Sequence, residues 1–196
     1  MLRNQILILI LACMLINPVL APADEIPTNK FSDASGPVEI FIFSDYFCPP
    51  CQSIEPYLED ALTKLHQSGA GITFVDMPFS AMTPVFSKYY LYAINAVDSF
   101  TEKLLVRRAL FDIARTRGVS SESELIQKLK AKHIKLVLLD VKPLFDQWVA
   151  LIKRFSIKST PTCVMIRPGQ AVVTYTGSRE IAEGIDQLLK VMPDNS

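Results

Sequence analysis

The spacing of apolar and polar residues predicts a β-α-β unit in the first half of the chain. Residues 38–43 (VEIFIF) and 72–77 (ITFVDM) are short apolar runs rich in β-branched and aromatic side chains, as buried strands are. Between them, residues 48–67 predict a helix, and Gly69 and Gly71 follow it as stop signals. Because a helix connects the two strands, we expect the strands to pair in parallel.

A helical pattern then fills residues 84–155. Apolar residues recur at helical spacing in its first part, and the polar run 120–124 (SSESE) is a strong N-terminal cap for a helix over 125–132. A further helix is expected over 141–155. Residues 134–139 could form a short strand, although we favour a loop or a helix there. A segment of this length cannot be a loop, so we expect it to pack as a helical subdomain.

The last part of the chain predicts a hairpin followed by a helix. Residues 163–166 (CVMI) and 171–175 have strand character, and the sequence Arg-Pro-Gly-Gln at 167–170 supplies the turn between them. A final helix is expected over 179–191. A β-α-β half and a β-β-α half together predict an α/β protein with a central mixed sheet and helices on both faces.

Length, composition and charge are consistent with one globular domain that contains an insertion. The 196 residues are 49% hydrophobic, and 20 Lys and Arg residues balance 20 Asp and Glu residues. No basic run is present, so nucleic acid and electrostatic membrane binding are not expected. We assign residues 38–83 and 156–192 to the core and residues 84–155 to the helical insertion.

The first residues predict export. Arg3 precedes an apolar run over 6–16, and Ala21-Pro22-Ala23 provides small residues before a cut at Asp24. We therefore expect residues 1–23 to be a signal peptide, residues 24–37 to be a flexible leader, and the mature protein to be periplasmic or otherwise extracytoplasmic. Two alternatives are an uncleaved membrane anchor and lipidation at Cys13. The short leader has no room for a dimerisation domain, and we expect a monomer.

The strongest chemical signal is the C-x-x-C pair of Cys48 and Cys51. An exported protein is in an oxidising compartment, where a pair separated by two residues makes a poor structural staple and a good redox switch. Pro49 favours a helix that starts with Cys48 as N-cap, where the helix dipole stabilises a thiolate. Cys48 is then the nucleophile and the more buried Cys51 the resolving thiol. Pro50 removes an N–H donor from the Cys48 thiolate, so the direction of electron flow stays open.

Other interpretations of these cysteines remain. A structural zinc site would need two further ligands from Cys163, His66 and His133, none of which forms a second spaced pair. A structural disulfide and a copper-binding set of Cys48, Cys51 and Cys163 are further alternatives. For Cys163 itself we favour a buried core thiol over a third redox or metal-binding sulfur.

Two motifs resemble the thioredoxin superfamily. The stretch CPPCQSIEPYLEDAL follows the pattern C-x-P-C-x-x-I-x-P-x-L, which includes Pro56 at the position of the helix kink. The stretch FSDYFCPPC is similar to the DsbA-like branch, and IKSTPTCVMI resembles the strand of that branch that begins after a cis-proline. A helical insertion between the second strand and this proline is also a DsbA-like feature. The resemblance covers residues 38–191.

The resemblance implies a thioredoxin-like fold and protein thiol–disulfide exchange without an organic cofactor or metal, through a redox-active Cys48–Cys51 disulfide. It also implies that Thr160 and a cis Pro161 contact extended, cysteine-containing segments of client proteins, and that electrons pass to a membrane redox partner. Oxidation of clients is favoured, because the branch is DsbA-like. Reduction or isomerisation, for example in cytochrome c maturation or disulfide repair, is the alternative.

One departure from the family pattern concerns the buried acid that many members carry six residues before the first cysteine. Ile42 occupies that position here. Glu39, Asp45 and Asp76 are substitutes in principle, but we expect each to be a solvated or capping residue. The sequence therefore identifies no proton acceptor for Cys51.

Overall fold

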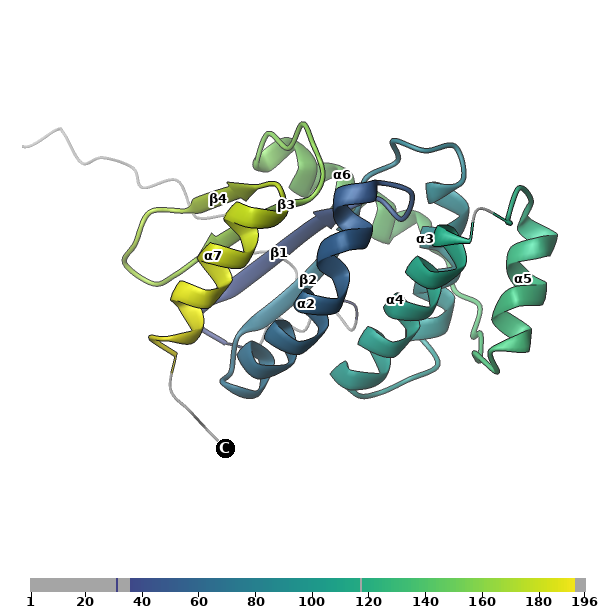
Figure 1. Cartoon of the computed structure of the whole chain (residues 1–196), viewed down its shortest axis with the longest axis horizontal. Helices are drawn as coiled ribbons and strands as arrows, with labels where there is room; N and C mark the ends of the chain where they lie inside the picture. Colours follow the sequence, from purple (N-terminus) through teal and green to yellow (C-terminus); the bar gives the residue numbers. More distant parts are fainter. Residues whose placement is uncertain (1–30, 32–35, 117, 193–196) are drawn as a thin grey trace, which may run out of the picture.

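The computed structural model describes residues 31, 36–116 and 118–192, which form a four-stranded sheet and six helices (Figure 1). The first half of the core comprises β1 (Glu39–Ser44), α2 (Pro49–Gln67) and β2 (Gly71–Asp76). The inserted helices are α3 (Thr83–Ile94), α4 (Phe100–Arg115), α5 (Glu122–Ala131) and α6 (Lys142–Arg154). The second half of the core comprises β3 (Thr162–Ile166), β4 (Val173–Thr176) and α7 (Ser178–Leu189).

The sheet is mixed, as the element order predicts. Its strand order is β2-β1-β3-β4, with β1 parallel to β2 and antiparallel to β3. β4 pairs with β3 as the second strand of the hairpin. The predicted parallel pair and the predicted hairpin are therefore both present, and β1 lies between them at the centre of the sheet.

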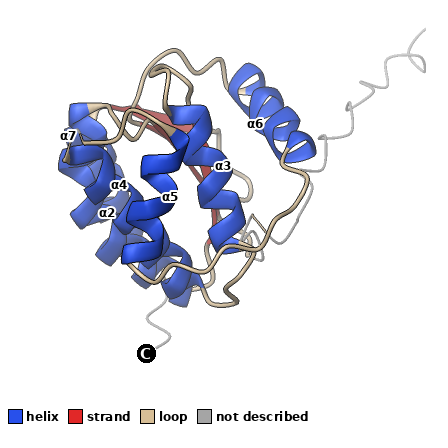
Figure 2. Cartoon of the chain, turned by 90° about the vertical axis from the view of Figure 1, so that its right-hand side faces the viewer, coloured by secondary structure: helices blue, strands red, loops and turns tan. Residues whose placement is uncertain are grey.

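Both faces of β1 are covered. Phe41 and Phe43 pack against Phe155 at the end of α6, with ring centroids 5.2 and 6.2 Å apart. α2 and α7 pack against each other and cover the opposite face, and Figure 2 shows α6 on the far side of the sheet from them. Because apolar side chains point alternately to two covered faces, β1 is an unbroken apolar run rather than an alternating one.

The insertion packs mainly through α4, which contacts α2, α3 and α5. Two of its helices, α4 and α5, start at capping boxes, formed by Ser99 with Glu102 and by Ser121 with Glu124. The second of these lies inside the polar run that predicted a helix start. The insertion is thus anchored on the helix that carries the cysteine pair.

Every predicted strand and helix of the described residues is present, with small differences at the ends. β4 begins at Val173 instead of Ala171, because residues 171 and 172 are exposed and belong to a longer hairpin loop. Residues 134–139 have no regular structure. The predicted signal peptide and most of the leader lie outside the described residues. In the described part of the chain, no helix combines the length and the apolar character that crossing a bilayer requires.

Candidate functional site

The helix α2 starts where the sequence predicts. Cys48 is the N-cap residue with extended backbone angles (φ −77°, ψ 117°), and Pro49 is the first helical residue. The Cys48 N–H donates to the Asp45 carbonyl (3.1 Å), and the Cys48 carbonyl accepts from the Gln52 N–H (3.0 Å). The first N–H groups of a helix have no partner within the helix, so Pro49 and Pro50 fit this turn without loss of a hydrogen bond.

Pro56 lies inside α2 without ending it. It has no N–H for the carbonyl of Gln52, four residues earlier. The guanidinium of Arg115 on α4 donates to this carbonyl instead (3.2 Å). Pro56 thus leaves the Gln52 carbonyl of α2 available to Arg115 of the helical insertion.

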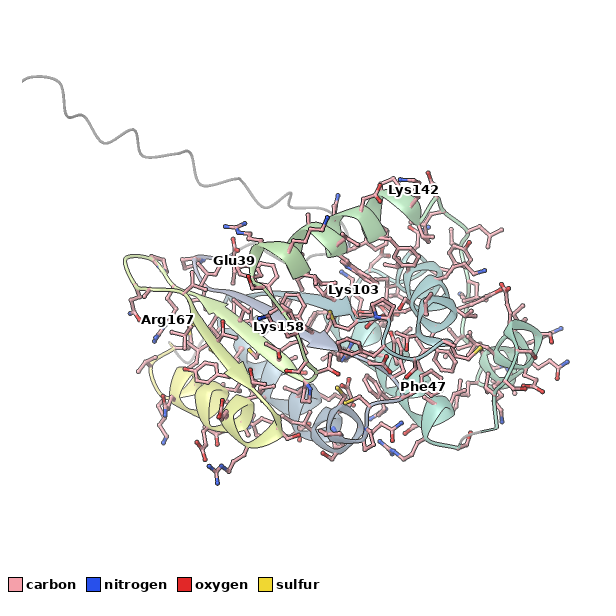
Figure 3. All side chains as sticks on the ribbon, turned by 90° about the horizontal axis from the view of Figure 1, so that it is seen from above. Glu39, Phe47, Lys103, Lys142, Lys158 and Arg167 are labelled. Carbon is pink, nitrogen blue, oxygen red and sulfur yellow. The ribbon has the colours of Figure 1, made fainter. Side chains whose placement is uncertain are left out.

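The fold brings the segment before β3 against the cysteine pair. The Thr160–Pro161 peptide bond is cis. The Cys48 thiol donates to the Thr160 carbonyl, with 3.4 Å between sulfur and oxygen, although the two residues are 112 positions apart. Phe47 and Lys158 mark the two segments in Figure 3. The structure thereby brings together the four residues Cys48, Cys51, Thr160 and Pro161.

The two thiols of the pair have different surroundings. Cys48 is half-buried, Cys51 is 1% exposed, and both are free thiols in this structure. Burial raises the pKa of Cys51 to about 12, and a hydrogen bond with the Asp45 backbone lowers it by less. Since the thiolate is the reactive form, the accessible Cys48 is the sulfur that can meet another molecule first.

The carbonyl of Pro50, which lies between the two cysteines in the sequence, accepts two hydrogen bonds. Both Ser53 and Ser178 donate their hydroxyl hydrogens to it, at 2.9 and 3.0 Å. Ser178 is the first residue of α7, so this contact ties the loop that follows β4 to the start of α2. No pattern in the sequence identified Ser178 as part of the site.

Asp45 organises the loop before Cys48. Its carboxylate accepts hydrogen bonds from the backbone N–H groups of Phe47 (2.7 Å) and Ser80 (3.0 Å) and from the hydroxyl groups of Ser80 and Thr83 (3.2 and 2.8 Å). The expectation of a solvated or capping Asp45 is therefore wrong, because these donors belong to two loops and neither α2 nor α3 is capped by a side chain. The side chain is buried, and it fixes the loop after β2 to the loop that precedes the cysteines.

A buried ion cluster lies beneath the start of α2. Arg107 of α4 is fully buried and pairs with Glu55 of α2, with its Nε 2.6 Å from one carboxylate oxygen and its Nη2 3.1 Å from the other. The same Nη2 donates to the Ser44 hydroxyl (2.9 Å), and Nη1 is 3.9 Å from the Asp76 carboxylate. The guanidinium also lies over the rings of Phe74 and Phe111, at 4.2 and 4.9 Å from their centroids.

The expectation of a solvated or capping Asp76 is wrong. Its side chain is almost fully buried and caps nothing, because β2 ends beneath the inserted helices α3 and α4. Burial raises the pKa of Asp76 to about 6, although the Arg107 charge opposes this rise. Burial likewise raises the pKa of Glu55 above its usual value. Glu39, the third predicted substitute, is half-buried at the start of β1.

The sequence reasoning missed Glu55 and Arg107. Glu55 is four residues after Cys51, on the buried face of α2, and Arg107 lies between the buried residues Leu104 and Leu110 on α4. A charged residue within an apolar stripe at helical spacing was the available signal. The pairing of the two stripes depends on how α4 packs on α2, which the sequence pattern does not specify.

Cys163 lies inside the sheet. It is fully buried on β3, beside Ile42 on β1, and burial raises its thiol pKa well above the usual range. Across residues 31, 36–116 and 118–192, no three His, Cys, Asp or Glu side chains are grouped so that they could hold a metal ion. The geometry thus supports the core-thiol interpretation of Cys163 and gives the zinc and copper alternatives no support.

Comparison with known proteins shows the fold. No protein-family model and no curated protein matches the sequence. Among solved structures, alpha-DsbA1 of Wolbachia pipientis has a TM-score of 0.60 at 12% identity and covers 82% of this chain and 90% of its own. DsbA2 of Pseudomonas aeruginosa has a TM-score of 0.57 at 14% identity, with 85% and 97% covered. A periplasmic thioredoxin-like protein of Salmonella enterica serovar Typhimurium has a TM-score of 0.57 at 18% identity, with 83% and 91% covered. The chain therefore has the DsbA-like thioredoxin fold.

Proposed function

We propose that the protein is an exported thiol–disulfide oxidoreductase that exchanges disulfides with client proteins through Cys48 and Cys51. The observation that carries this proposal is the contact between the Cys48 thiol and the Thr160 carbonyl. It places an accessible cysteine at a helix N-terminus directly beside a cis-proline loop. The DsbA-like fold and the CPPC sequence support the same function.

In the oxidising direction, a client thiolate attacks Sγ of Cys48 in the Cys48–Cys51 disulfide, and Cys51 leaves as a thiolate that takes up a proton. A second client thiolate attacks the client sulfur of the mixed disulfide, and Cys48 leaves as a thiolate. The client gains one disulfide and the protein gains two electrons. The reverse sequence reduces a client disulfide, and in that direction Cys51 is the resolving thiol.

The client contacts follow from the backbone beside the pair. Thr160 is half-buried and its carbonyl faces Cys48, so an extended client segment can pair with this stretch as an added strand while its cysteine reaches the Cys48 sulfur. Electrons taken from clients must pass to a second partner, for which we propose a membrane redox protein. The protein acts as a monomer in the periplasm or another extracytoplasmic compartment, as the Salmonella structural neighbour is periplasmic.

Trapping of clients tests the exchange function. The Cys51→Ser variant retains the nucleophile and lacks the resolving thiol, so we expect it to accumulate mixed disulfides with exported proteins, visible on non-reducing gels and identified by mass spectrometry. The Cys48→Ser variant is the matched control and should form none. Equal amounts of mixed disulfide in the two variants, or none in either, would contradict the proposal.

The direction of exchange is measured by the reduction potential in glutathione buffers. We propose oxidation of clients. A reduction potential of about −120 mV would support this direction, because that value is typical of a strong oxidant of this fold. A reduction potential of about −270 mV would instead identify the protein as a reductase. At either potential, a Cys51→Ser variant that traps no clients would identify a protein without exchange activity.

A further inference from the structure

The buried cluster of Glu55, Asp76 and Arg107 contains more acidic than basic groups. One guanidinium faces two carboxylates, and the pairing is unequal. Glu55 contacts Arg107 through both of its oxygens at 2.6 and 3.1 Å, whereas the Asp76 carboxylate is 3.9 Å from the guanidinium. The Asp76 carboxylate accepts no hydrogen bond from the guanidinium, and the hydroxyl groups of Tyr46 and Ser87 are its neighbouring donors. With both carboxylates ionised the cluster carries one net negative charge, and with one proton bound it is neutral.

The geometry identifies Asp76 as the group that binds this proton. Glu55 is held by the guanidinium, and Asp45, in the loop after β1, accepts four hydrogen bonds. An ionised carboxylate without a closely paired cation is costly in a buried position, whereas its protonated form is neutral. The raised pKa of Asp76, caused mainly by burial, agrees with this assignment.

Among the charged groups that act on Asp76, Arg107 has the largest effect. From the loop after β1, the phenol of Tyr46 lies near the carboxylate, and from α3 the hydroxyl of Ser87 does. On the α6 side, Asp76 lines an apolar cavity of about 200 Å³ to which α6 contributes only apolar side chains. The ionisable groups that act on the three members of the cluster include Asp45, Tyr46, Glu59, Tyr90 and Arg115.

The cluster is connected to the cysteine pair through two short backbone paths. Glu55 lies one helical turn after Cys51 on the buried face of α2, a spacing at which side chains are neighbours. Arg107 donates to Ser44, and the next residue, Asp45, accepts the Cys48 N–H on its carbonyl. The medium between the cluster and the cysteines is therefore protein rather than solvent, so a change of charge in the cluster is weakly screened.

We propose that Asp76 is a proton-binding site which tunes the Cys48–Cys51 pair through the net charge of the buried Glu55–Asp76–Arg107 cluster. The idea rests on the exchange function proposed above. With Asp76 ionised, the extra negative charge opposes formation of the Cys48 thiolate. With Asp76 protonated, the cluster is neutral and the thiolate forms more readily. The dithiol is thereby coupled to the external pH near neutrality, and Asp76 acts through the cysteines without touching the client.

The test is the thiolate titration of Cys48 in the reduced protein, followed by ultraviolet absorbance and by the rate of iodoacetamide alkylation. The Asp76→Asn variant keeps the shape of the side chain and removes the charge. Above about pH 7 we expect it to hold a several-fold to about tenfold larger fraction of Cys48 as thiolate than the wild-type protein. Below about pH 5 the two curves should coincide, since Asp76 is then neutral in the wild-type protein as well.

Asp146→Asn is the matched control. Asp146 is a surface residue of α6 whose side chain is 64% exposed and pairs with Lys142, so the same change of charge should leave the Cys48 titration unchanged. Identical curves for the wild-type protein and Asp76→Asn, or equal shifts in both variants, would overturn the proposal.

A second measurement uses the wild-type protein and does not depend on the folding of a variant. Asp76 can change its charge near neutral pH only if it binds its proton there. Carboxyl-carbon NMR of the reduced protein should show a titration midpoint of about 6 for Asp76, and a midpoint at the usual value of about 4 would overturn the role. Client trapping tests the exchange function separately. Trapped clients without an effect of Asp76 on the Cys48 titration would refute only the role of Asp76. Such an effect without trapped clients would refute only the exchange function.

Discussion

At the scale of single residues, burial distinguishes the three described cysteines. Cys48 is half-buried, Cys51 is 1% exposed and Cys163 is fully buried in the sheet. Burial raises the pKa of the last two thiols, so neither is a thiolate at neutral pH in the reduced protein. Three sulfurs that look alike in the sequence thus have three different reactivities.

Alkylation of the native reduced protein checks this order. We expect iodoacetamide to modify Cys48 quickly and Cys163 on the order of a thousandfold more slowly, because Cys163 becomes accessible only on unfolding. Peptide mass spectrometry assigns each site, and the Cys163→Ala variant should show an unchanged rate at Cys48. A second fast site mapped to Cys163 would contradict the assignment of a core thiol.

Asp76 predicts a pH-dependent stability with a defined sign. Its pKa is raised from 3.8 to about 6 in the folded protein, so the folded state binds the proton more tightly than the unfolded state. The stabilising contribution is complete below about pH 4 and is lost as the pH rises through about 6, a change of about 2–3 kcal/mol. Urea unfolding at several pH values should show this loss in the wild-type protein and not in Asp76→Asn. Parallel curves for the two proteins would contradict the raised pKa.

The sequence predicts some of these residues well and others not at all. Cys48 is predictable as an N-cap because Pro49 restricts the backbone locally. Asp76 is not predictable, because a carboxylate at the end of a strand is usually solvated, and its burial depends on where the inserted helices lie. Glu55 and Arg107 are distant in sequence and become a pair only in the folded protein. The position of Cys48 could thus be predicted from its neighbours in the sequence. The burial of Asp76 and the pairing of Glu55 with Arg107 could not, because both depend on tertiary packing.

At the scale of elements, the contact between α2 and α4 is the connection that matters for the site. Arg107 and Arg115 of α4 bond to Glu55 and to the Gln52 carbonyl of α2. The second of these acceptors is free because Pro56 lacks an N–H. The inserted helices therefore act on the helix that carries the cysteines, and not only on the sheet.

A double-mutant cycle measures this connection. We expect Arg107→Met to lower the free energy of unfolding by about 3–5 kcal/mol, because it leaves Glu55 and Asp76 buried without a cation. The Arg107→Met, Glu55→Gln double variant should be destabilised by clearly less than the sum of the single variants. Arg108→Met is the control, since Arg108 is 53% exposed and its pair with Glu59 should contribute less than about 1 kcal/mol. Additive effects at Arg107 and Glu55 would show that the two helices are not coupled through this pair.

At the scale of the whole molecule, the element order was sufficient to predict the mixed sheet and the helical insertion. A helix crossover favours the parallel arrangement of β1 and β2, and a short turn favours the antiparallel one of β3 and β4. The order of the strands and the position of α6 on the far side of the sheet from α2 are tertiary features (Figure 2), for which the sequence pattern contains no local signal. The predicted signal peptide lies outside the described residues and stays a prediction.

The cavity beside Asp76 has a consequence for spectroscopy. The chain contains one tryptophan, Trp148, which is 8% exposed and lines this cavity. Its ring is tilted against that of Phe145, with 5.5 Å between centroids. A carboxylate quenches and shifts indole emission differently from a carboxylic acid, because the charge alters the field at the ring. The tryptophan emission of the protein therefore comes from a single indole at the wall of one cavity, and it provides a label-free optical readout at the place where the buried proton binds.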